Sequence, residues 1–209
     1  MNVSADIYLE RLRAASSTGN NARFTEFRRQ IYQSFSDNHD WLGIEDFFRG
    51  VVLACVPKEV QSALFRKTDE LPTLSEALGN SLQTAVGLAA DDPGVAALYC
   101  EYFDDGGDAS SLDVYLCLRF DREDDFWASD FNRSVSGPRV DSYFDFDPKG
   151  ELLDPTASIA REYLHARLLG VVGRLADEHV RERLPFGFAE HDGFIVYVQS
   201  RVARRNARS

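Results

Sequence analysis

Residues 112–120 read LDVYLCLRF, and this stretch indicates the fold more directly than any other part of the chain. Leu112, Val114 and Leu116 alternate with Asp113 and Tyr115, and a period of two is typical of a strand with one buried face. Residues 95–103, VAALYCEYF, are almost all apolar or aromatic, which is typical of a strand covered on both faces. Two glycines lie between these stretches and permit positive φ, so we predict an antiparallel hairpin.

Two further segments, Val140–Phe146 and Phe194–Gln199, have strand composition and are predicted to complete one mainly antiparallel sheet. The chain before the sheet has apolar residues at spacings of three and four, which predicts several helices. A long helix is expected from Pro155 to about Arg183, before the last strand, with one buried apolar stripe: Leu164, Leu168, Val171, Val172 and Leu175. The predicted class is therefore α+β.

The predicted domain organisation is a single α+β domain over residues 1–209. Residues 1–92 form the helical part, residues 93–200 form the sheet with the long helix, and residues 201–209 form a basic tail. A chain of this length with 44% hydrophobic residues can bury a substantial core. No apolar run approaches the roughly 20 residues that span a bilayer, and no secretory signal is evident. We expect a cytoplasmic protein that does not bind membranes.

Net charge is concentrated in one quarter of the chain. Residues 101–154 hold 15 acidic residues against 5 Lys or Arg, whereas the whole chain has a net charge of −11. Such a field attracts basic surfaces and repels nucleic-acid phosphates. We therefore expect a basic protein partner and no nucleic acid.

Sequence motifs for cofactors and metals are weak. Asp145 and Asp147 stand at positions one and three of a calcium-loop pattern with Gly150 at six, but Lys149 and Thr156 occupy positions that need oxygen ligands. Three cysteines without C-x-x-C spacing argue against a zinc ribbon and a disulfide framework. No phosphate-binding loop is present. We expect no cofactor and no dedicated metal site.

A histidine beside carboxylates gives an enzymatic alternative. Glu190-His191-Asp192-Gly193 could supply an oriented base, although Asp-Gly is also strong turn chemistry before a strand. The alternative to a binding protein is therefore a small cytosolic hydrolase that uses His191 with Asp192, or a metal held by the aspartate cluster.

Aromatic and acidic residues are interleaved through the acidic segment. Protein interfaces often combine aromatic anchors with charged rims. Trp127, which lies in a polar loop, and Tyr143 are the expected anchors. The complete set of expected partner-binding residues is Asp104, Asp105, Asp124, Asp125, Trp127, Asp130, Asp141, Tyr143 and Asp145. No catalytic residue is assigned, and we expect a protein that is not an enzyme.

The chain resembles bacterial immunity proteins, which neutralise polymorphic toxins. The resemblance is carried by the mixture of acidic and aromatic residues in three stretches, residues 99–107, 127–131 and 186–193. The resemblance lies in the small, acidic α+β character over residues 95–200, not in a specific motif. It implies a stoichiometric inhibitor that binds a basic toxin or effector and occludes its active site or substrate groove.

Overall fold

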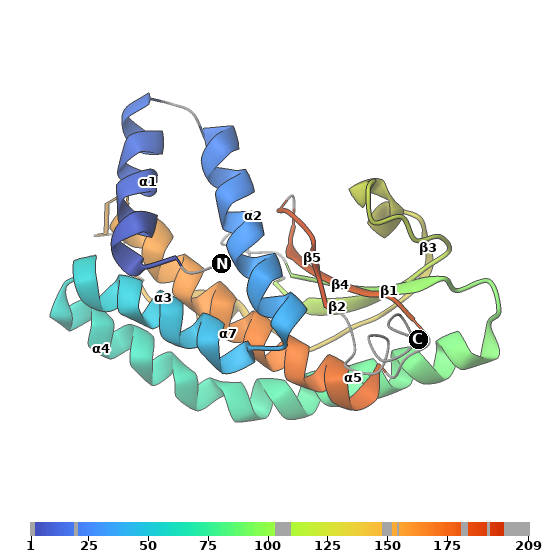
Figure 1. The fold of residues 1–209 in the computed structure, drawn as a ribbon. Helices are drawn as coiled ribbons and strands as arrows, with labels where there is room; N and C mark the ends of the chain where they lie inside the picture. Colours follow the sequence, from blue (N-terminus) through green and yellow to red (C-terminus); the bar gives the residue numbers. More distant parts are fainter. Residues whose placement is uncertain are drawn as a thin grey trace. The chain divides into compact units, whose positions relative to one another are not determined.

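The computed structural model describes residues 3–18, 21–102, 110–147, 152–153, 155–180, 184–191 and 193–198. In this part of the chain, the helices before the sheet are α1 (Ala5–Thr18), α2 (Asn21–Asn38), α3 (Trp41–Cys55), α4 (Lys58–Arg66), the 3-10 helix η1 (Lys67–Glu70) and α5 (Leu71–Asp91). Then follow β1 (Ala97–Tyr102), β2 (Leu112–Cys117), the 3-10 helix η2 (Asp125–Ser129) and β3 (Phe131–Val135). The chain continues through α6 (Asp141–Phe144), the long helix α7 (Thr156–His179), β4 (Phe186–Glu190) and β5 (Val196–Tyr197) (Figure 1). The predicted α+β class is confirmed.

Contacts divide the chain into two compact units. Unit 1 comprises Met1–Glu70 and Tyr143–Gly170, and unit 2 comprises Leu71–Ser142 and Val171–Ser209. Helix α7 contributes its first part to unit 1 and its last part to unit 2. This division does not follow the expected boundary between a helical part and a sheet part, and the folding of the chain as one domain stays a prediction.

In unit 1, the turn between α2 and α3 is fixed by local backbone chemistry. His39 has a φ of 53°, the left-handed conformation that commonly ends a helix. Asp40 then caps α3, because its side chain accepts a hydrogen bond from the Gly43 amide at 3.0 Å. Helix α3 ends at Cys55, and Val56 is extended, because the proline that follows it disfavours a helical conformation at this position.

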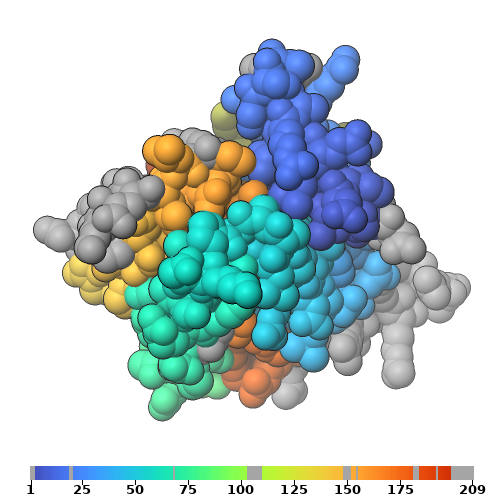
Figure 2. Space-filling view, turned by 90° about the vertical axis from the view of Figure 1, so that its left-hand side faces the viewer, coloured from blue at the N-terminus to red at the C-terminus, as the bar shows by residue number. Residues whose placement is uncertain are grey.

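The core of unit 1 is aromatic and includes a buried polar group of residues. Tyr32 is fully buried, stacks on Phe48 at 5.1 Å and donates a hydrogen bond to the Glu162 carboxylate at 2.8 Å. Arg28 forms an ion pair with the same carboxylate. Helix α4 and the first part of α7 lie side by side (Figure 2). The rings of Phe65 and Tyr163, one from each helix, meet edge-on at 5.6 Å.

Unit 2 contains a five-stranded sheet in the order β3-β2-β1-β4-β5. Strand β1 pairs with β2 antiparallel and with β4 parallel, and the two outer pairs are antiparallel. The expected hairpin of β1 and β2 is therefore confirmed. The predicted alternation is confirmed from Leu112 to Leu116, because Leu112, Val114 and Leu116 are fully buried. The predicted strand runs on to Phe120, but β2 ends at Cys117, and Leu118 and Phe120 are exposed.

The two faces of this sheet differ. One face carries Leu98, Cys100 and Tyr102 of β1 and is fully buried. Helix α5 contacts β2 and β3 within unit 2. The opposite face carries Tyr99 and Glu101 and is covered only in part, by the segment that includes η2 (Figure 1).

The prediction of a strand over Val140–Phe146 is wrong, because residues 141–144 form helix α6. The reason is that β3, which the sequence did not predict, occupies the second edge of β2. Residues next to α6 reach only the start of β2, through an isolated bridge between Ser111 and Arg139. Strand β4 was also not predicted, and the long helix ends at His179 rather than near Arg183.

The expected stripe of α7 is confirmed, since each of its members is buried. His165 of the same helix is 6% exposed, and its ring meets Tyr32 edge-on at 5.1 Å. Burial, with a smaller contribution from the positive charge of Arg28, lowers the pKa of His165 to about 3. The imidazole is therefore neutral in the folded protein at physiological pH.

We predict that His165 makes the fold sensitive to acid. Its pKa is lower in the folded than in the unfolded chain, so its contribution to stability is present above about pH 6.5 and is lost as the pH falls towards 3. The free energy of unfolding should fall by up to about 1.4 kcal/mol per pH unit in this window. Urea unfolding at several pH values should show a shallower dependence for His165→Leu, and parallel curves would contradict the assignment.

Candidate functional site

A cleft of about 510 Å³ opens on the partly covered face of the sheet in unit 2. This volume lies within the range of small-molecule and side-chain binding sites. Strands β1 and β2 contribute Tyr99, Glu101 and Tyr115, and the turn after β4 contributes His191. The η2 segment and its surroundings add further lining residues: Asp125, Phe126, Ala128, Ser129 and Phe131.

His191 and Glu101 meet at this cleft because β1 and β4 run parallel. The last pair in their register is Tyr102 with Glu190, and the His191 amide then donates to the Tyr102 carbonyl at 2.8 Å. His191 Nδ1 lies 3.1 Å from Glu101 Oε1, and the Tyr99 hydroxyl donates to the same oxygen at 3.2 Å. An ionised carboxylate only accepts hydrogen bonds, so the contact needs a proton on Nδ1.

The sequence singled out His191 but missed Glu101 as its partner. It offered Glu190 and Asp192 instead, and Asp192 lies outside the described residues. The local signal that Glu101 shares a face with Tyr99 was present, because residues two apart on a strand point the same way. The pairing of β1 with β4 had no local signal.

Both tyrosines of the cleft are neutral hydroxyl groups under physiological conditions. Burial, followed by the negative charge of Glu101, raises the pKa of Tyr99. Burial, followed by Asp113 and Glu101, raises the pKa of Tyr115 to about 12. Neither phenol therefore serves as a base or a nucleophile here, whereas the aromatic faces and the Glu101 carboxylate favour positive charge.

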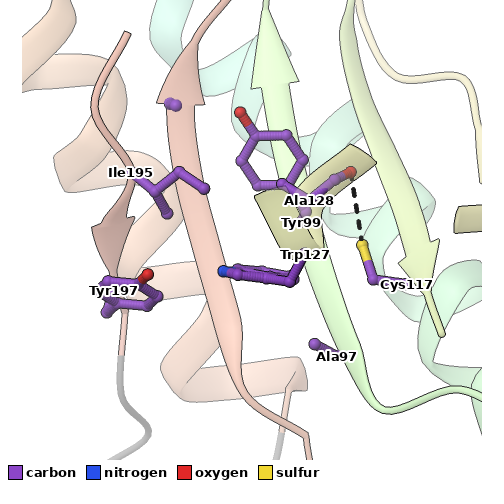
Figure 3. Close-up of a cluster of buried hydrophobic side chains, with 8 residues drawn as sticks. Ala97, Tyr99, Cys117, Trp127, Ala128, Ile195 and Tyr197 are labelled. Carbon is purple, nitrogen blue, oxygen red and sulfur yellow. Dashed lines mark hydrogen bonds between the residues drawn. The ribbon is translucent and has the colours of Figure 1, made fainter. Parts of the chain in front are cut away.

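Trp127 belongs to η2, and its side chain is fully buried. Figure 3 shows its ring between Tyr99 and Tyr197, and its centroid is 5.8 Å from that of Tyr99. A Cβ on Gly187 would approach Trp127 Cζ2 to 3.1 Å, so glycine permits this close packing. The expectation that Trp127 is a surface anchor is therefore wrong, and its ring is core.

The expectation that Tyr143 is an anchor for a partner is also wrong. Its side chain in unit 1 is fully buried, and its hydroxyl donates to the Leu164 carbonyl at 3.1 Å. Burial, the largest cause, raises its pKa. Asp145, two residues later, is exposed.

The predicted aspartates of unit 2 include several with structural contacts. Asp124 caps η2 through the Phe126 amide, and Asp125 accepts a hydrogen bond from the Tyr197 hydroxyl at 2.7 Å. Asp130 lies 3.5 Å from Arg119, and Asp141 pairs with Arg139 at 2.9 Å. Asp104 and Asp105 lie outside the described residues.

The cysteines have the character of apolar side chains. Cys100 and Cys117 are buried, and Cys117 Sγ faces the Ala128 carbonyl at 3.9 Å (Figure 3). Burial raises the pKa of Cys117 to about 12, so its thiol is protonated and unreactive.

The residues that the structure describes contain neither a cluster of metal ligands nor a membrane-spanning helix. No three His, Cys, Asp or Glu side chains come together there in a way that could hold a metal ion. In the same part of the chain, no helix combines the length and apolar character needed to cross a bilayer.

Comparisons with protein-family models, curated proteins and solved structures find no match to this chain. Function is therefore inferred from the cleft and its charges.

We predict that adjacent aromatic residues of η2 differ sharply in their effect on stability. Trp127→Ala should lower the free energy of unfolding by about 3–5 kcal/mol, because it empties a buried site. Phe126→Ala is the matched control: its side chain is 77% exposed, so the change should stay within about 0.5 kcal/mol. Chemical denaturation measures both values. Equal effects would show that η2 does not pack on the sheet as described.

Proposed function

We propose that this protein is a cytoplasmic binding module that inhibits a basic protein partner, in the manner of an immunity protein acting on a toxin or effector. The supporting observation is the cleft on the partly covered sheet face, where aromatic rings adjoin the carboxylates of Glu101 and Asp125. Its local chemistry suits a positively charged group from the partner. The acidic segment that surrounds it supplies the long-range attraction.

Surface anchors for such a partner are present beside the cleft. Phe126 is 77% exposed and Phe131 is 45% exposed, and both line the cleft. Exposed aromatic rings next to charged groups are typical of interface centres. These phenylalanines take the role that the sequence assigned to Trp127.

Charged residues around η2 form the rim of the proposed interface. Glu123 and Asp130 are exposed, and neither side chain accepts a backbone hydrogen bond that would make it part of the fold. They are therefore better sites for charge reversal than Asp124 and Asp125, which hold η2 and Tyr197.

We predict that association with the partner is fast at low salt and slows as salt rises. Exposed charges are screened beyond about 8 Å at physiological ionic strength. Reversing Glu123 and Asp130 to Lys should lower the association rate about tenfold while the dissociation rate changes little. Stopped-flow or surface-based kinetics with the purified partner, identified from the neighbouring gene or by pull-down, measure both rates.

The matched control reverses Glu10 and Glu26, two exposed residues of unit 1, and changes the net charge by the same amount. We expect it to retain most of the association rate. A salt-independent rate, or equal losses in the two variants, would contradict the proposed interface.

A hydrolase is the second candidate, and the contact between His191 and Glu101 favours it. A carboxylate that orients an imidazole is a common arrangement for a general base, and Ser129 also lines the cleft. If the binding function is correct, we expect no turnover of ester, amide or phosphoester substrates that depends on His191. Turnover by the parent chain that His191→Ala abolishes, with the fold retained by circular dichroism, would instead support the hydrolase.

A further inference from the structure

We propose that the cleft of unit 2 receives an arginine side chain of the partner, with the guanidinium against the second carboxylate oxygen of Glu101. This inference rests on the proposed function, since the partner supplies the arginine. It goes further by naming the group that is recognised and the residue that recognises it.

The first argument is the state of the Glu101 carboxylate. Its Oε1 is contacted by both the Tyr99 hydroxyl and His191 Nδ1. Among the described residues, the hydrogen bonds and ion pairs of this carboxylate are all made by Oε1, and no donor contacts Oε2. The side chain is only 14% exposed, so the carboxylate is held in place with one oxygen available to a donor in the cleft.

The second argument is the row of aromatic rings that lines the same cleft as Glu101. The centroids of Tyr99 and Tyr115 are 6.1 Å apart, and those of Tyr115 and Phe131 are 4.6 Å apart. A cation within about 6 Å of an aromatic centroid is attracted to the face of the ring. A planar guanidinium can also stack on such a ring, which a lysine ammonium cannot do.

The third argument is that the chain does not supply this cation itself. No Lys or Arg is among the described residues that line the cleft. The nearby arginines have other contacts: Arg119 lies near Asp124 and Asp130, and Arg122 lies over the Tyr197 ring at 5.3 Å. The latter contact shows the same chemistry on a neighbouring aromatic ring of unit 2.

Other classes of ligand fit less well. An anion would meet Glu101 and Asp125, and both carry negative charge when ionised. A wholly apolar group would desolvate the second oxygen of Glu101 without a replacement donor. An arginine side chain would donate a hydrogen bond to this oxygen and would also cover the aromatic rings.

The test uses the full-length chain and three capped tripeptides, Gly-X-Gly, in which X is arginine, citrulline or lysine. Citrulline keeps the shape of arginine and removes its charge. Binding is followed by NMR shifts of the Tyr99, Tyr115 and His191 signals. We expect the arginine peptide to bind at least about tenfold more tightly than the citrulline peptide, and more tightly than the lysine peptide.

Two variants locate the site. Glu101→Gln is nearly isosteric, and we expect it to weaken arginine binding about tenfold or more. Glu76→Gln makes the same substitution on an exposed position of α5 in unit 2, and should bind as the parent does. Thermal unfolding of both variants checks that the fold is retained. If Glu101→Gln is unstable, Tyr115→Leu replaces it, and should also weaken binding.

Three results would overturn the proposal: citrulline binding as tightly as arginine, lysine binding more tightly than arginine, or equal arginine binding by the parent and Glu101→Gln. These measurements need no partner protein. Failure of the arginine site is therefore distinguishable from failure of the inhibitor function, which is judged by the salt-dependent kinetics with the partner.

Discussion

Parallel pairing of β1 with β4 joins two segments almost ninety residues apart. It determines where the cleft lies and how the Trp127 ring packs on the sheet. The register sets Tyr99 beside Gly187 and ends with Tyr102 beside Glu190, so His191 emerges next to Glu101. A slip of one residue would exchange the two faces of β4. Phe186 or Phe188 would then lie where Gly187 now accommodates the Trp127 ring.

The elements that could be predicted from the sequence are those whose burial follows a local period. Strand β2 alternates from Leu112 to Leu116, and α7 has a continuous apolar stripe. Strand β3 has no such period, because residues 131–134 lie exposed at the edge of the sheet. Residues 140–146 show the converse, since their alternation predicts a strand although β3 already occupies the edge they would need.

The candidate site was predictable in composition but not in geometry. The sequence located the acidic, aromatic segment and the histidine, whereas the partner of that histidine depends on non-local pairing. Trp127 and Phe126 illustrate the limit. They are neighbours in one short 3-10 helix, yet one is fully buried and the other is 77% exposed. The direction in which η2 docks decides between them, and the acids on either side give no indication of it.

Glu101 is not required by the packing of the sheet. Positions 97 and 99 on the same face of β1 belong to the apolar cluster around Trp127, and an aliphatic side chain at 101 would extend that cluster. A carboxylate at 14% exposure instead loses hydration, which the Tyr99 hydroxyl and the His191 imidazole offset at only one of its oxygens. A site held in this state loses less conformational freedom when a cation arrives, because the acceptor is already oriented. The position of Glu101 is therefore better explained by the proposed arginine site than by the stability of the fold.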